Sequence, residues 1–433
     1  MTTQIVTVNV TQTIAPAPSQ LQRTGALVSQ GATTLTPGTS SLLTQYSDLT
    51  SILAGSISIT TMTWASSVVS VITATPHGIP SGDTILGLIT GVTPVAYNGT
   101  FQITSTGTNT FTYPLVAGPG VVTIQGVYTN ESVQDLVAMA TTFFAQGSQN
   151  SVYVLELGVG TAAEGVVALG AYIIDPTVVF YGYCLTTELS GESTMVALAN
   201  EYAATTSQVY FWVTETIGDY GLFSDIKSVI SMCQDVTAPV TEWSIAAMFW
   251  NALNYNPQDT NKVAPMAFQY LRGVTAFTGK QAQQQALKTA NVNYVGTGAE
   301  GGISNTLVLW GVNSDGNDFT YWYSVDWVQI NINRSISAAI INGSNNPINP
   351  LYYNQAGINT LQKVAQGTIN SGIAFGLVLA PSTVYAVTFN TYITNNPGDY
   401  ALGKYAGLSV TYTPARGFIQ IIFNVNVSSF ALA

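Results

Sequence analysis

The residues of this chain that could do chemistry begin with a glycine-rich motif. Residues 296–301 read GTGAEG and fit the pattern G-x-G-x-x-G. Dinucleotide binding requires such a loop to open a helix, because the amides at the helix N-terminus hold the pyrophosphate. Here the residues that follow, SNTLVLW, have the pattern of a strand. We therefore interpret the motif as a flexible glycine loop and reject a nucleotide site.

Two further motifs suggest a metal or a catalytic relay. Asn313, Asp315 and Gly316 resemble part of a calcium loop, but an EF-hand would need acidic residues where Gly311 and Trp322 stand. We predict a hairpin turn there. His77 is the only histidine, so it cannot build a two-histidine zinc site. A Ser-His-Asp relay through it is left open in principle, but the turn residues around it favour a structural role.

The remaining chemical candidates are a lysine motif and four acids. Residues 224–227 (SDIK) match S-x-x-K, and we predict an amphipathic helix there with Lys227 solvated. Paired carboxylates for glycoside hydrolysis are also left open by the sequence. The candidate acids are Glu188, Glu192, Asp315 and Asp318. Their sequence contexts favour solvation and helix capping instead. We predict no enzyme, and no catalytic residue, metal or cofactor.

Composition indicates a folded protein whose neighbours are other proteins. Charged residues make up 7% of the 433-residue chain, against about 25% in an average soluble protein. A neutral polar surface repels other proteins weakly and suits assembly. The net charge is −11, and no Lys or Arg stands between Arg23 and Lys227. Phosphate recognition needs clustered cations, so we predict no nucleic-acid partner.

The cysteines and the apolar stretches do not indicate secretion or a membrane. Cys184 and Cys233 could form one disulfide, although such cysteines are more often small buried hydrophobes. The start, MTTQIVTVNV, lacks the features of a signal peptide. Asp175-Pro176 divides the most apolar stretch, Val166 to Leu185, which we predict to be a buried strand-loop-strand. We expect a soluble protein without membrane insertion.

The elements that must position these residues form several domains, α/β and α+β in class. Residues 21–56 and 129–302 alternate helices, near 131–146, 193–205 and 280–290, with strands such as SVYVLEL and QVYFWVT, which predicts an α/β core. Between these parts, residues 57–128 predict an inserted all-β domain, with frequent turns and Asp83 as the only charge. Residues 303–433 predict an α+β domain that begins with a TLVLWGV–FTYWYSV hairpin and continues with helices near 326–341 and 355–370.

Both ends of the chain have strand patterns. Val6, Val8 and Val10 share one face of a short strand within residues 1–20, which we predict to be an extended arm. Near the other end, GFIQIIFNVNV places Ile419, Ile421, Phe423, Val425 and Val427 on one face.

Taken together, several stretches resemble the contractile bacteriophage tail sheath family. They are LVAMATTFFAQGSQNSVYVLEL (136–157), MAFQYLRGVTAFTGKQAQQQALKTANVNYV (266–295), VDWVQININRSISAAI and YNQAGINTLQKVAQGTINSGI. Residues 73–113 resemble a small β module inserted into many phage structural proteins. The order of the segments matches over most of the chain.

The resemblance implies a structural subunit that polymerises helically around the tail tube. Contraction then drives the tube through the host envelope for genome ejection. It also implies that the terminal strands enter neighbouring subunits and complete their sheets, and that the C-terminal domain faces the tube. Lys363 is the position we carry over as a tube contact, with Arg334 and Arg416 as weaker candidates.

The partners implied are further copies of the chain, the tail tube protein, and the baseplate and tail terminator proteins. The expected location is the virion, after assembly in the host bacterial cytoplasm. Two alternatives remain: a glycan-binding tail fibre or adhesin that uses its aromatic β surfaces, and a glycan-cleaving enzyme that uses Asp/Glu pairs.

Overall fold

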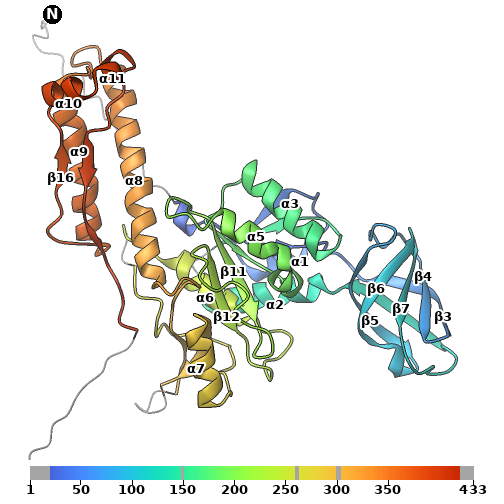
Figure 1. The fold of residues 1–433 in the computed structure, drawn as a ribbon. Coiled ribbons are helices and arrows are strands. Elements are labelled where there is room, and N and C mark those ends of the chain that lie inside the picture. The colour runs from blue at the N-terminus through green and yellow to red at the C-terminus, as the bar shows by residue number, and fades with distance from the viewer. Residues whose placement is uncertain (1–19, 148–150, 259–262, 299–303, 420–433) are drawn as a thin grey trace, which may run out of the picture. The chain divides into compact units, whose positions relative to one another are not determined.

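The computed structural model describes residues 20–147, 151–258, 263–298 and 304–419 (Figure 1). The chain divides into two compact units. We call residues 21–323 with 416–419 the core unit, and residues 324–415 the C-terminal unit. The protein is a mixed α/β chain of more than one domain.

The core unit is built on an eight-stranded sheet of order β14-β13-β12-β11-β10-β1-β9-β2. Strands β1, β9, β10, β11, β12 and β13 run parallel to one another. At the two edges, β2 pairs antiparallel with β9 and β14 pairs antiparallel with β13. Strands covered on both faces are expected to be continuously apolar, and β1 and β12 are buried at every position. The strands are β1 Gly25–Ser29, β2 Thr39–Leu43, β9 Val152–Glu156, β10 Gly182–Cys184, β11 Tyr210–Glu215, β12 Val229–Cys233, β13 Asn293–Thr297 and β14 Thr306–Leu309.

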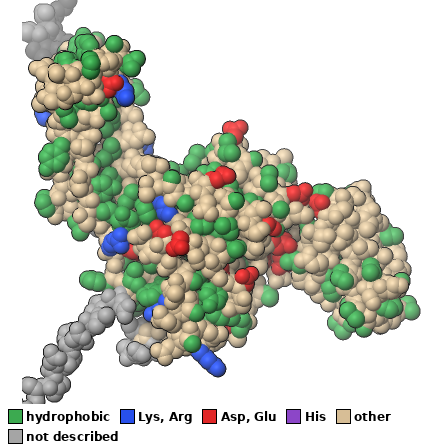
Figure 2. Space-filling model, in the orientation of Figure 1, with side chains coloured by type: hydrophobic (Ala, Val, Ile, Leu, Met, Phe, Trp, Pro, Cys, Tyr) green, Lys and Arg blue, Asp and Glu red, His purple; other side chains and the backbone are tan. Residues whose placement is uncertain are grey.

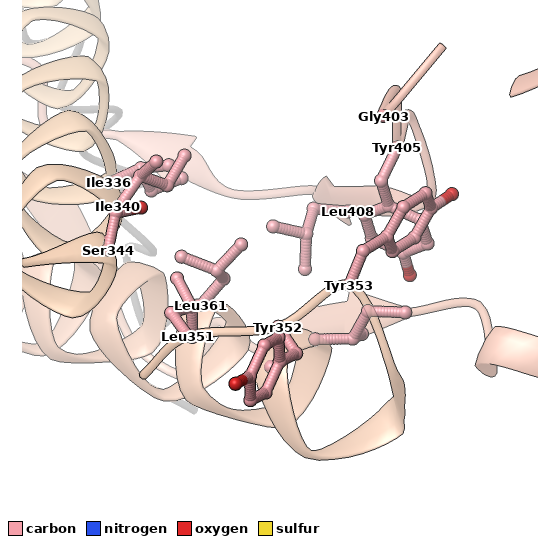
Figure 3. Close-up of a pocket in the computed structure, with 12 residues that line it drawn as sticks. Ile336, Ile340, Ser344, Leu351, Tyr352, Tyr353, Leu361, Gly403, Tyr405 and Leu408 are labelled. Atoms are coloured by element: carbon pink, nitrogen blue, oxygen red, sulfur yellow. The ribbon is translucent and has the colours of Figure 1, made fainter. Parts of the chain in front are cut away.

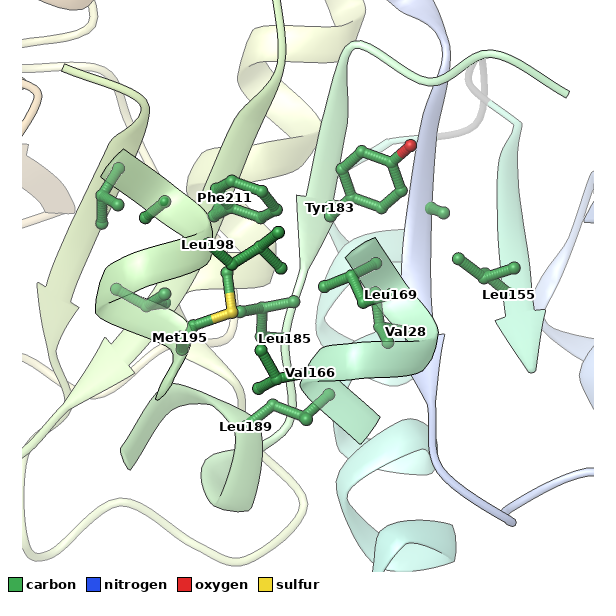
Figure 4. Close-up of a cluster of buried hydrophobic side chains, with 14 of the residues drawn as sticks. Val28, Leu155, Val166, Leu169, Tyr183, Leu185, Leu189, Met195, Leu198 and Phe211 are labelled. Atoms are coloured by element: carbon green, nitrogen blue, oxygen red, sulfur yellow. The ribbon is translucent and has the colours of Figure 1, made fainter. Parts of the chain in front are cut away.

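Helices cover both faces of this sheet. Leu169 of α3 and Met195 and Leu198 of α5 pack on Phe211 and Tyr183 of the sheet (Figure 4). The next residue after Phe211, Trp212, points to the other face, where its ring lies 5.4 Å from that of Phe249 in α6. The helices are η1 Leu21–Arg23, α1 Tyr46–Thr50, α2 Ser132–Ala145, α3 Ala162–Ile174, α4 Thr187–Gly191, α5 Ser193–Glu201, α6 Ser244–Asn254 and α7 Gln281–Thr289.

Six strands between α1 and α2 close into a barrel of order β3-β4-β7-β6-β5-β8. They alternate between interior and surface; in β4, Val69, Val71 and Thr73 point inward. The barrel surface drawn in Figure 2 is mostly hydrophobic and neutral polar. The elements are β3 Ile57–Ala65, β4 Val68–Thr73, β5 Thr84–Thr93, η2 Val95–Tyr97, β6 Gly99–Gly107, β7 Thr110–Pro114 and β8 Ile124–Asn130.

Two long helices dominate the C-terminal unit. Trp327 of α8 packs against Phe375, which follows α9, with ring centroids 5.7 Å apart. The strands of this unit form two sheets of two strands each, β15-β18 and β16-β17. The elements are α8 Phe319–Ser344, α9 Gln355–Ala374, β15 Val378–Leu379, β16 Val384–Ala386, α10 Phe389–Asn395, α11 Pro397–Ala401, β17 Leu408–Val410 and β18 Thr413–Pro414.

Three local predictions are wrong. FTYWYSV begins helix α8 and is no hairpin strand: Phe319, Trp322 and Tyr323 are buried together at helical spacing. Residues 166–174 belong to helix α3, so the predicted strand-loop-strand is a helix, a loop and the short strand β10. No helix passes through Lys227; turns lead from β11 to β12.

The predictions for three helices and for the burial of the cysteines agree with the structure. The predicted helices near 131–146, 193–205 and 280–290 are present as α2, α5 and α7. Cys184 and Cys233 are both buried and free. Over the described ranges, no helix is long and apolar enough to cross a membrane.

Candidate assembly surfaces

The C-terminal segment leaves the core unit from a fixed point at Arg416 and Gly417. The Gly417 N–H donates to Asp318 Oδ2 at 2.8 Å. The Arg416 guanidinium donates to Asn317 Oδ1 at 3.1 Å and lies 4.2 Å from the centre of the Tyr321 ring. We call this set of contacts the C-terminal anchor.

Burial makes the anchor specific. Asp318 is 1% exposed, and burial raises the pKa of its carboxyl while the Gly417 N–H opposes that shift. A Cβ added at Gly417 would lie 2.3 Å from Cβ of Pro265, so a larger residue does not fit without movement. These contacts fix the path of the chain at Arg416 and Gly417. The other predicted strand residues lie outside the described residues; they are Val6, Val8, Val10, Ile421, Phe423 and Val425.

The C-terminal unit has strand edges that could accept another strand. Each of its sheets, β15-β18 and β16-β17, has two strands, and no third strand from the described residues joins either. A sheet of two strands is marginally stable in water by itself. In β16, the Val384 N–H donates to Gln366 Oε1 and the Val384 carbonyl accepts from Gln362 Nε2, both at 2.8 Å, so these groups are already bonded to α9. Strand-edge groups without such partners pair readily with an incoming strand.

An apolar groove of about 500 Å³ lies beside β17 in the same unit. Figure 3 shows Leu361 and Leu408 in its wall, with Ile336 and Ile340 of α8 across from them. Tyr352 at its rim is 66% exposed. The chemistry of such a groove suits aliphatic and aromatic side chains.

Large hydrophobic side chains are also exposed elsewhere on the C-terminal unit. Scattered single residues are normal on a protein surface, but gathered ones mark interaction sites. Those of this unit are Ile340, Ile341, Ile348, Tyr352, Leu379, Tyr385, Val387, Tyr400 and Leu402. They add to the groove and the strand edges as apolar surface for a protein neighbour.

The three candidate tube contacts differ in their surroundings. Lys363 is exposed on α9, and Arg334 is half-buried on α8. The ion pair found in the described part of the chain, Lys404 with Asp399 at 3.8 Å, involves neither of them. Arg416 belongs to the C-terminal anchor, which occupies its guanidinium. Lys363 and Arg416 are both exposed, but only Arg416 is held by the anchor, and the tube contact of Lys363 stays a prediction.

His77 has a structural environment. It is 5% exposed, its Nδ1 accepts from the Ile79 N–H at 3.2 Å, and its Nε2 lies 2.8 Å from the Gly107 carbonyl oxygen. Because Nδ1 accepts, Nε2 carries the proton and donates. Both nitrogens are used inside the barrel, which agrees with the predicted structural role.

Lys227 contradicts its prediction. It is 4% exposed, and its Nζ donates to the carbonyl oxygens of Ala204 at 3.2 Å and Ser207 at 2.6 Å. The same ammonium lies 5.1 Å from the centre of the Tyr210 ring and 4.9 Å from that of Trp322. Carbonyl oxygens and ring faces thus replace water around the charge. The lysine stabilises this part of the core unit.

The four candidate acids divide into two kinds. Glu192 Oε1 accepts from the Thr194 N–H at the start of α5, and Asp315 Oδ2 accepts from the Trp322 Nε1–H, so capping and local bonding account for both. Asp318 is buried, so solvation is the wrong interpretation for it. Glu188 is half-buried in the first turn of α4, and its Oε1 accepts from the Leu86 N–H at 3.2 Å. Within the described ranges, no group of three or more His, Cys, Asp or Glu side chains is placed to hold a metal ion.

Glu156, at the end of β9, is a residue that sequence reasoning missed. Its Oε1 accepts from the N–H groups of Gly31 and Gly158, at 2.6 and 2.7 Å. Its Oε2 accepts from Ser29 Oγ at 2.6 Å and from the N–H and Oγ1 of Thr33 at 3.1 and 2.7 Å. The signal was an acid at the end of an otherwise apolar strand, with a glycine two residues later.

This arrangement bears on nucleotide binding. Anions bind open α/β sheets at the carboxyl ends of the strands, held by backbone N–H groups. At the ends of β1 and β9, those N–H groups already donate to the carboxylate of Glu156. In addition, the strand predicted after the GTGAEG motif is present as β14, which begins at Thr306. Residues 299–303 lie outside the described ranges.

Solved structures share the fold of the whole chain, whereas no family model and no curated protein matches it. A chain of the anti-feeding prophage baseplate is 13% identical with a TM-score of 0.56, and the alignment covers 99% of this chain and 100% of that one. A chain of the same baseplate in the contracted state is 11% identical with a TM-score of 0.53, over 98% and 97% of the two chains. A sheath tail protein from Listeria innocua is 12% identical with a TM-score of 0.45, over 90% and 91%. The chain thus resembles in fold a protein of that baseplate.

Proposed function

We propose that this protein is a structural subunit of a contractile tail sheath. The observation that carries the proposal is the likeness in fold to a chain of the anti-feeding prophage baseplate over 99% of this chain. That baseplate has also been solved in a contracted state. The ordered resemblance of the sequence segments to tail sheath proteins supports the same role.

In this proposal the subunits are joined by their terminal strands. Residues 4–10 and 419–427 of one copy add to strand edges of its neighbours, where backbone hydrogen bonds attach them and alternating side chains set the register. The two short sheets and the apolar groove of the C-terminal unit are the surfaces best suited to receive them. Since each copy offers its ends to a different surface on the next, the contacts propagate as a helix.

The joined subunits would surround a tail tube. Lys363, with Arg334 as a second contact, would face the tube protein, and the ends of the assembly would meet the baseplate and a tail terminator. Because strand linkages survive while the bodies rotate, an extended lattice could shorten and drive the tube through the envelope for genome ejection. The protein would hydrolyse nothing, would be assembled in the host cytoplasm and would end in the virion.

Electron microscopy of the purified full-length chain tests this function. We expect tubes or rings. Removing residues 1–14, or introducing Ile421→Glu with Phe423→Glu, should leave monomers with an unchanged circular dichroism spectrum. The matched control is Gln420→Glu with Asn424→Glu, which adds the same charge on the other face of the strand and should still polymerise. A wild-type chain that stays monomeric at high concentration, or a truncated chain that forms normal tubes, refutes the proposed joining.

The tube contact has its own test. Lys363→Glu should still form sheath-like tubes alone but should lose co-assembly with the tube protein in a pelleting assay. Lys280→Glu reverses another exposed lysine, on the core unit, and should co-assemble normally. Equal co-assembly of both variants would remove Lys363 from the proposal.

A second candidate function, a glycan-binding tail fibre or adhesin, is favoured by one feature of the barrel. A pocket of about 430 Å³ is lined by Trp64 and Tyr97, together with Gly118, Gly120, Val121 and Val122. Trp64 is 38% exposed and could stack on a sugar ring. A glycan array with the full chain tests this, with Trp64→Ala as the comparison. An array without a signal, or signals that the substitution leaves unchanged, would count against glycan binding.

A further inference from the structure

A small pocket lies at the carboxyl ends of the neighbouring parallel strands β10 and β11, and we call it the β11 pocket. Its volume is about 90 Å³, which is room for several water molecules, since one water needs about 10–15 Å³. Its polar side chains all offer oxygen, and none offers nitrogen or sulfur. They belong to α4 and to the end of β11 with the turn that follows, and they are Thr187, Ser190, Thr214, Glu215, Thr216 and Asp219.

This edge of the sheet carries two buried glutamates in equivalent positions, but only one of them has its partners. Ligands bind open α/β sheets outside the carboxyl ends of the strands. At the end of β9, five donors converge on the two oxygens of Glu156. Glu215 ends β11 in the same way, yet it accepts from one donor, the Gly221 N–H, which lies 3.0 Å from Oε2. Its Oε1 is buried and has no hydrogen-bond partner in the described part of the chain.

The burial of Glu215 makes the unpartnered oxygen costly. The residue is 6% exposed, so water does not replace the missing donor. A buried carboxylate without partners is strongly disfavoured. Burial accordingly raises the pKa of Glu215 to about 7, against the Gly221 N–H, and the charge of Asp219 adds to the rise. The ion pair found among the described residues joins Lys404 to Asp399, so it does not neutralise Glu215. The oxygen is therefore suited to a positively charged ligand.

Both walls of the β11 pocket are held in place. Ser190 of α4 is buried, and its Oγ accepts from the Thr214 N–H at 3.3 Å. Leu189 of the same helix lies in the hydrophobic cluster on the sheet (Figure 4). On the other wall, Thr216 and Asp219 close a tight turn, in which each N–H donates to the other's carbonyl, at 3.2 and 3.1 Å. This turn presents the exposed carboxylate of Asp219 at the pocket.

The oxygen ligands select among cations. Zn²⁺ favours nitrogen and sulfur ligands, which the β11 pocket does not offer. Mg²⁺ demands near-ideal octahedral geometry, whereas Ca²⁺ accepts irregular shells of oxygen at about 2.3–2.6 Å. That distance is shorter than the roughly 2.7–2.9 Å of an ammonium–carboxylate contact, which favours a metal ion at an oxygen that water does not reach. Two carboxylates, Glu215 and Asp219, balance the charge of a divalent ion.

We propose that the β11 pocket binds Ca²⁺, with Glu215 as the buried ligand and Asp219 as the second carboxylate. Hydroxyl groups of the pocket and water complete the shell of oxygens. The bound ion ties the turn at residues 216–221 to α4, across the carboxyl ends of β10 and β11. The site goes beyond the proposed function, because it needs no neighbouring subunit. It is built on two carboxylates, so it differs from the groups of three or more acidic, His or Cys side chains that the described ranges do not contain.

Terbium luminescence of the full chain at pH 8 tests the site. Tb³⁺ replaces Ca²⁺ at oxygen sites and emits when a nearby aromatic ring, such as Trp212 of β11 or Tyr220, transfers its excitation. We expect a saturable signal that Ca²⁺ displaces with a dissociation constant of about 10⁻⁴–10⁻³ M. Glu215→Gln should abolish the signal, and Asp219→Asn should weaken binding about tenfold. Glu201→Gln removes an exposed acid on α5 and should bind as the wild type does.

Hydrogen exchange separates a ligand from a merely structural glutamate. With Ca²⁺ at ten times its dissociation constant, peptides from α4 and from residues 216–221 should exchange about tenfold more slowly in the wild type. Without Ca²⁺, Glu215→Gln should exchange no faster than the wild type, because the amide still accepts from the Gly221 N–H and buries no charge. Adding Ca²⁺ should leave this variant unchanged.

Three results would overturn the proposal. One is a wild-type chain without any response at about 10 mM Ca²⁺, ten times the weakest dissociation constant expected. Another is a Ca²⁺ response that persists in Glu215→Gln. The third is an equal slowing by Mg²⁺ at the same concentration, which would show that the ion is not selected as Ca²⁺.

Discussion

Glu156 offers the sharpest test of how the core unit is held together. The change is Glu156→Gln, which keeps the shape of the side chain and removes its charge. In the wild type, five donors converge on the two carboxylate oxygens of a side chain that is 1% exposed. An amide offers one acceptor oxygen and two donors of its own.

The size of the loss follows from the donors. The cheaper orientation turns the new NH₂ group towards Ser29 and Thr33, because their hydroxyls can rotate and accept. The Thr33 N–H then faces another donor, and a buried unpaired N–H costs about 1–3 kcal/mol. The two bonds from Gly31 and Gly158 lose their charge assistance, at roughly 1 kcal/mol each. Burying an amide costs less than burying a carboxylate, which offsets part of the sum, so we expect a destabilisation of about 3 kcal/mol.

Hydrogen exchange measured by mass spectrometry reports this locally. Peptides from β1 and β9 should exchange about a hundredfold faster in the variant, since about 1.4 kcal/mol corresponds to a factor of ten. Peptides from β6 in the barrel serve as an internal reference and should not change. Glu201→Gln, on the surface, should leave β1 and β9 as in the wild type. A change of less than about threefold in those strands would refute the assigned role of Glu156.

Three further predictions concern stability and reactivity. Gly311→Ala should lower the melting temperature by several degrees more than Gly38→Ala. Both glycines have a positive φ, 70° for Gly311 and 77° for Gly38, so backbone strain is similar in the two variants. A Cβ at Gly311 would also lie 2.3 Å from the Ala267 nitrogen, whereas a Cβ at Gly38 would meet open space. Equal losses would contradict this. Lys227→Met should cost about 2–4 kcal/mol of unfolding free energy, because two buried carbonyls lose a charged donor, whereas Lys363→Met on the surface should be nearly neutral in the same denaturant titration. Cys184 and Cys233 should resist a thiol reagent until the chain unfolds, because burial raises the pKa of the Cys233 thiol to about 12 and that of Cys184 further; rapid labelling of the native chain would show that one of them is accessible.

Local patterns identified those elements whose surroundings are simple. In the barrel, each strand has water on one face and the interior on the other, so the alternation seen in β4 can be read from its residues alone. KQAQQQALKTA has strong helix formers and little else, and helix α7 occupies Gln281–Thr289. The resemblance to tail sheath proteins concerned the order of the sequence segments, whereas the comparison of structures shows a likeness in fold to a chain of the anti-feeding prophage baseplate.

Contacts from distant residues explain where local patterns were misleading. FTYWYSV alternates like a strand, yet Phe319 and Tyr323 are buried on one helical face against aromatic rings of the core unit, such as those of Trp212 and Tyr181. Lys227 is buried because the carbonyls of residues 204 and 207 and the ring of Trp322 surround it. Neither could be predicted from neighbours in the sequence. The surfaces for assembly were predicted at the two ends, whereas the groove that could receive them needed three-dimensional coordinates.

The C-terminal anchor has a mechanical consequence. In the joining proposed above, a neighbour that pulls on residues 420–433 would apply tension first to Gly417 and Arg416, which contact Asp318, Asn317 and Tyr321. The load therefore enters the core unit before it reaches β18, a strand of two residues that pairs with β15 alone. A force that would peel apart so short a sheet is instead borne by the start of α8 and the large core beneath it. In a lattice that changes length abruptly, this would let the linking segment transmit force without unfolding the unit next to it.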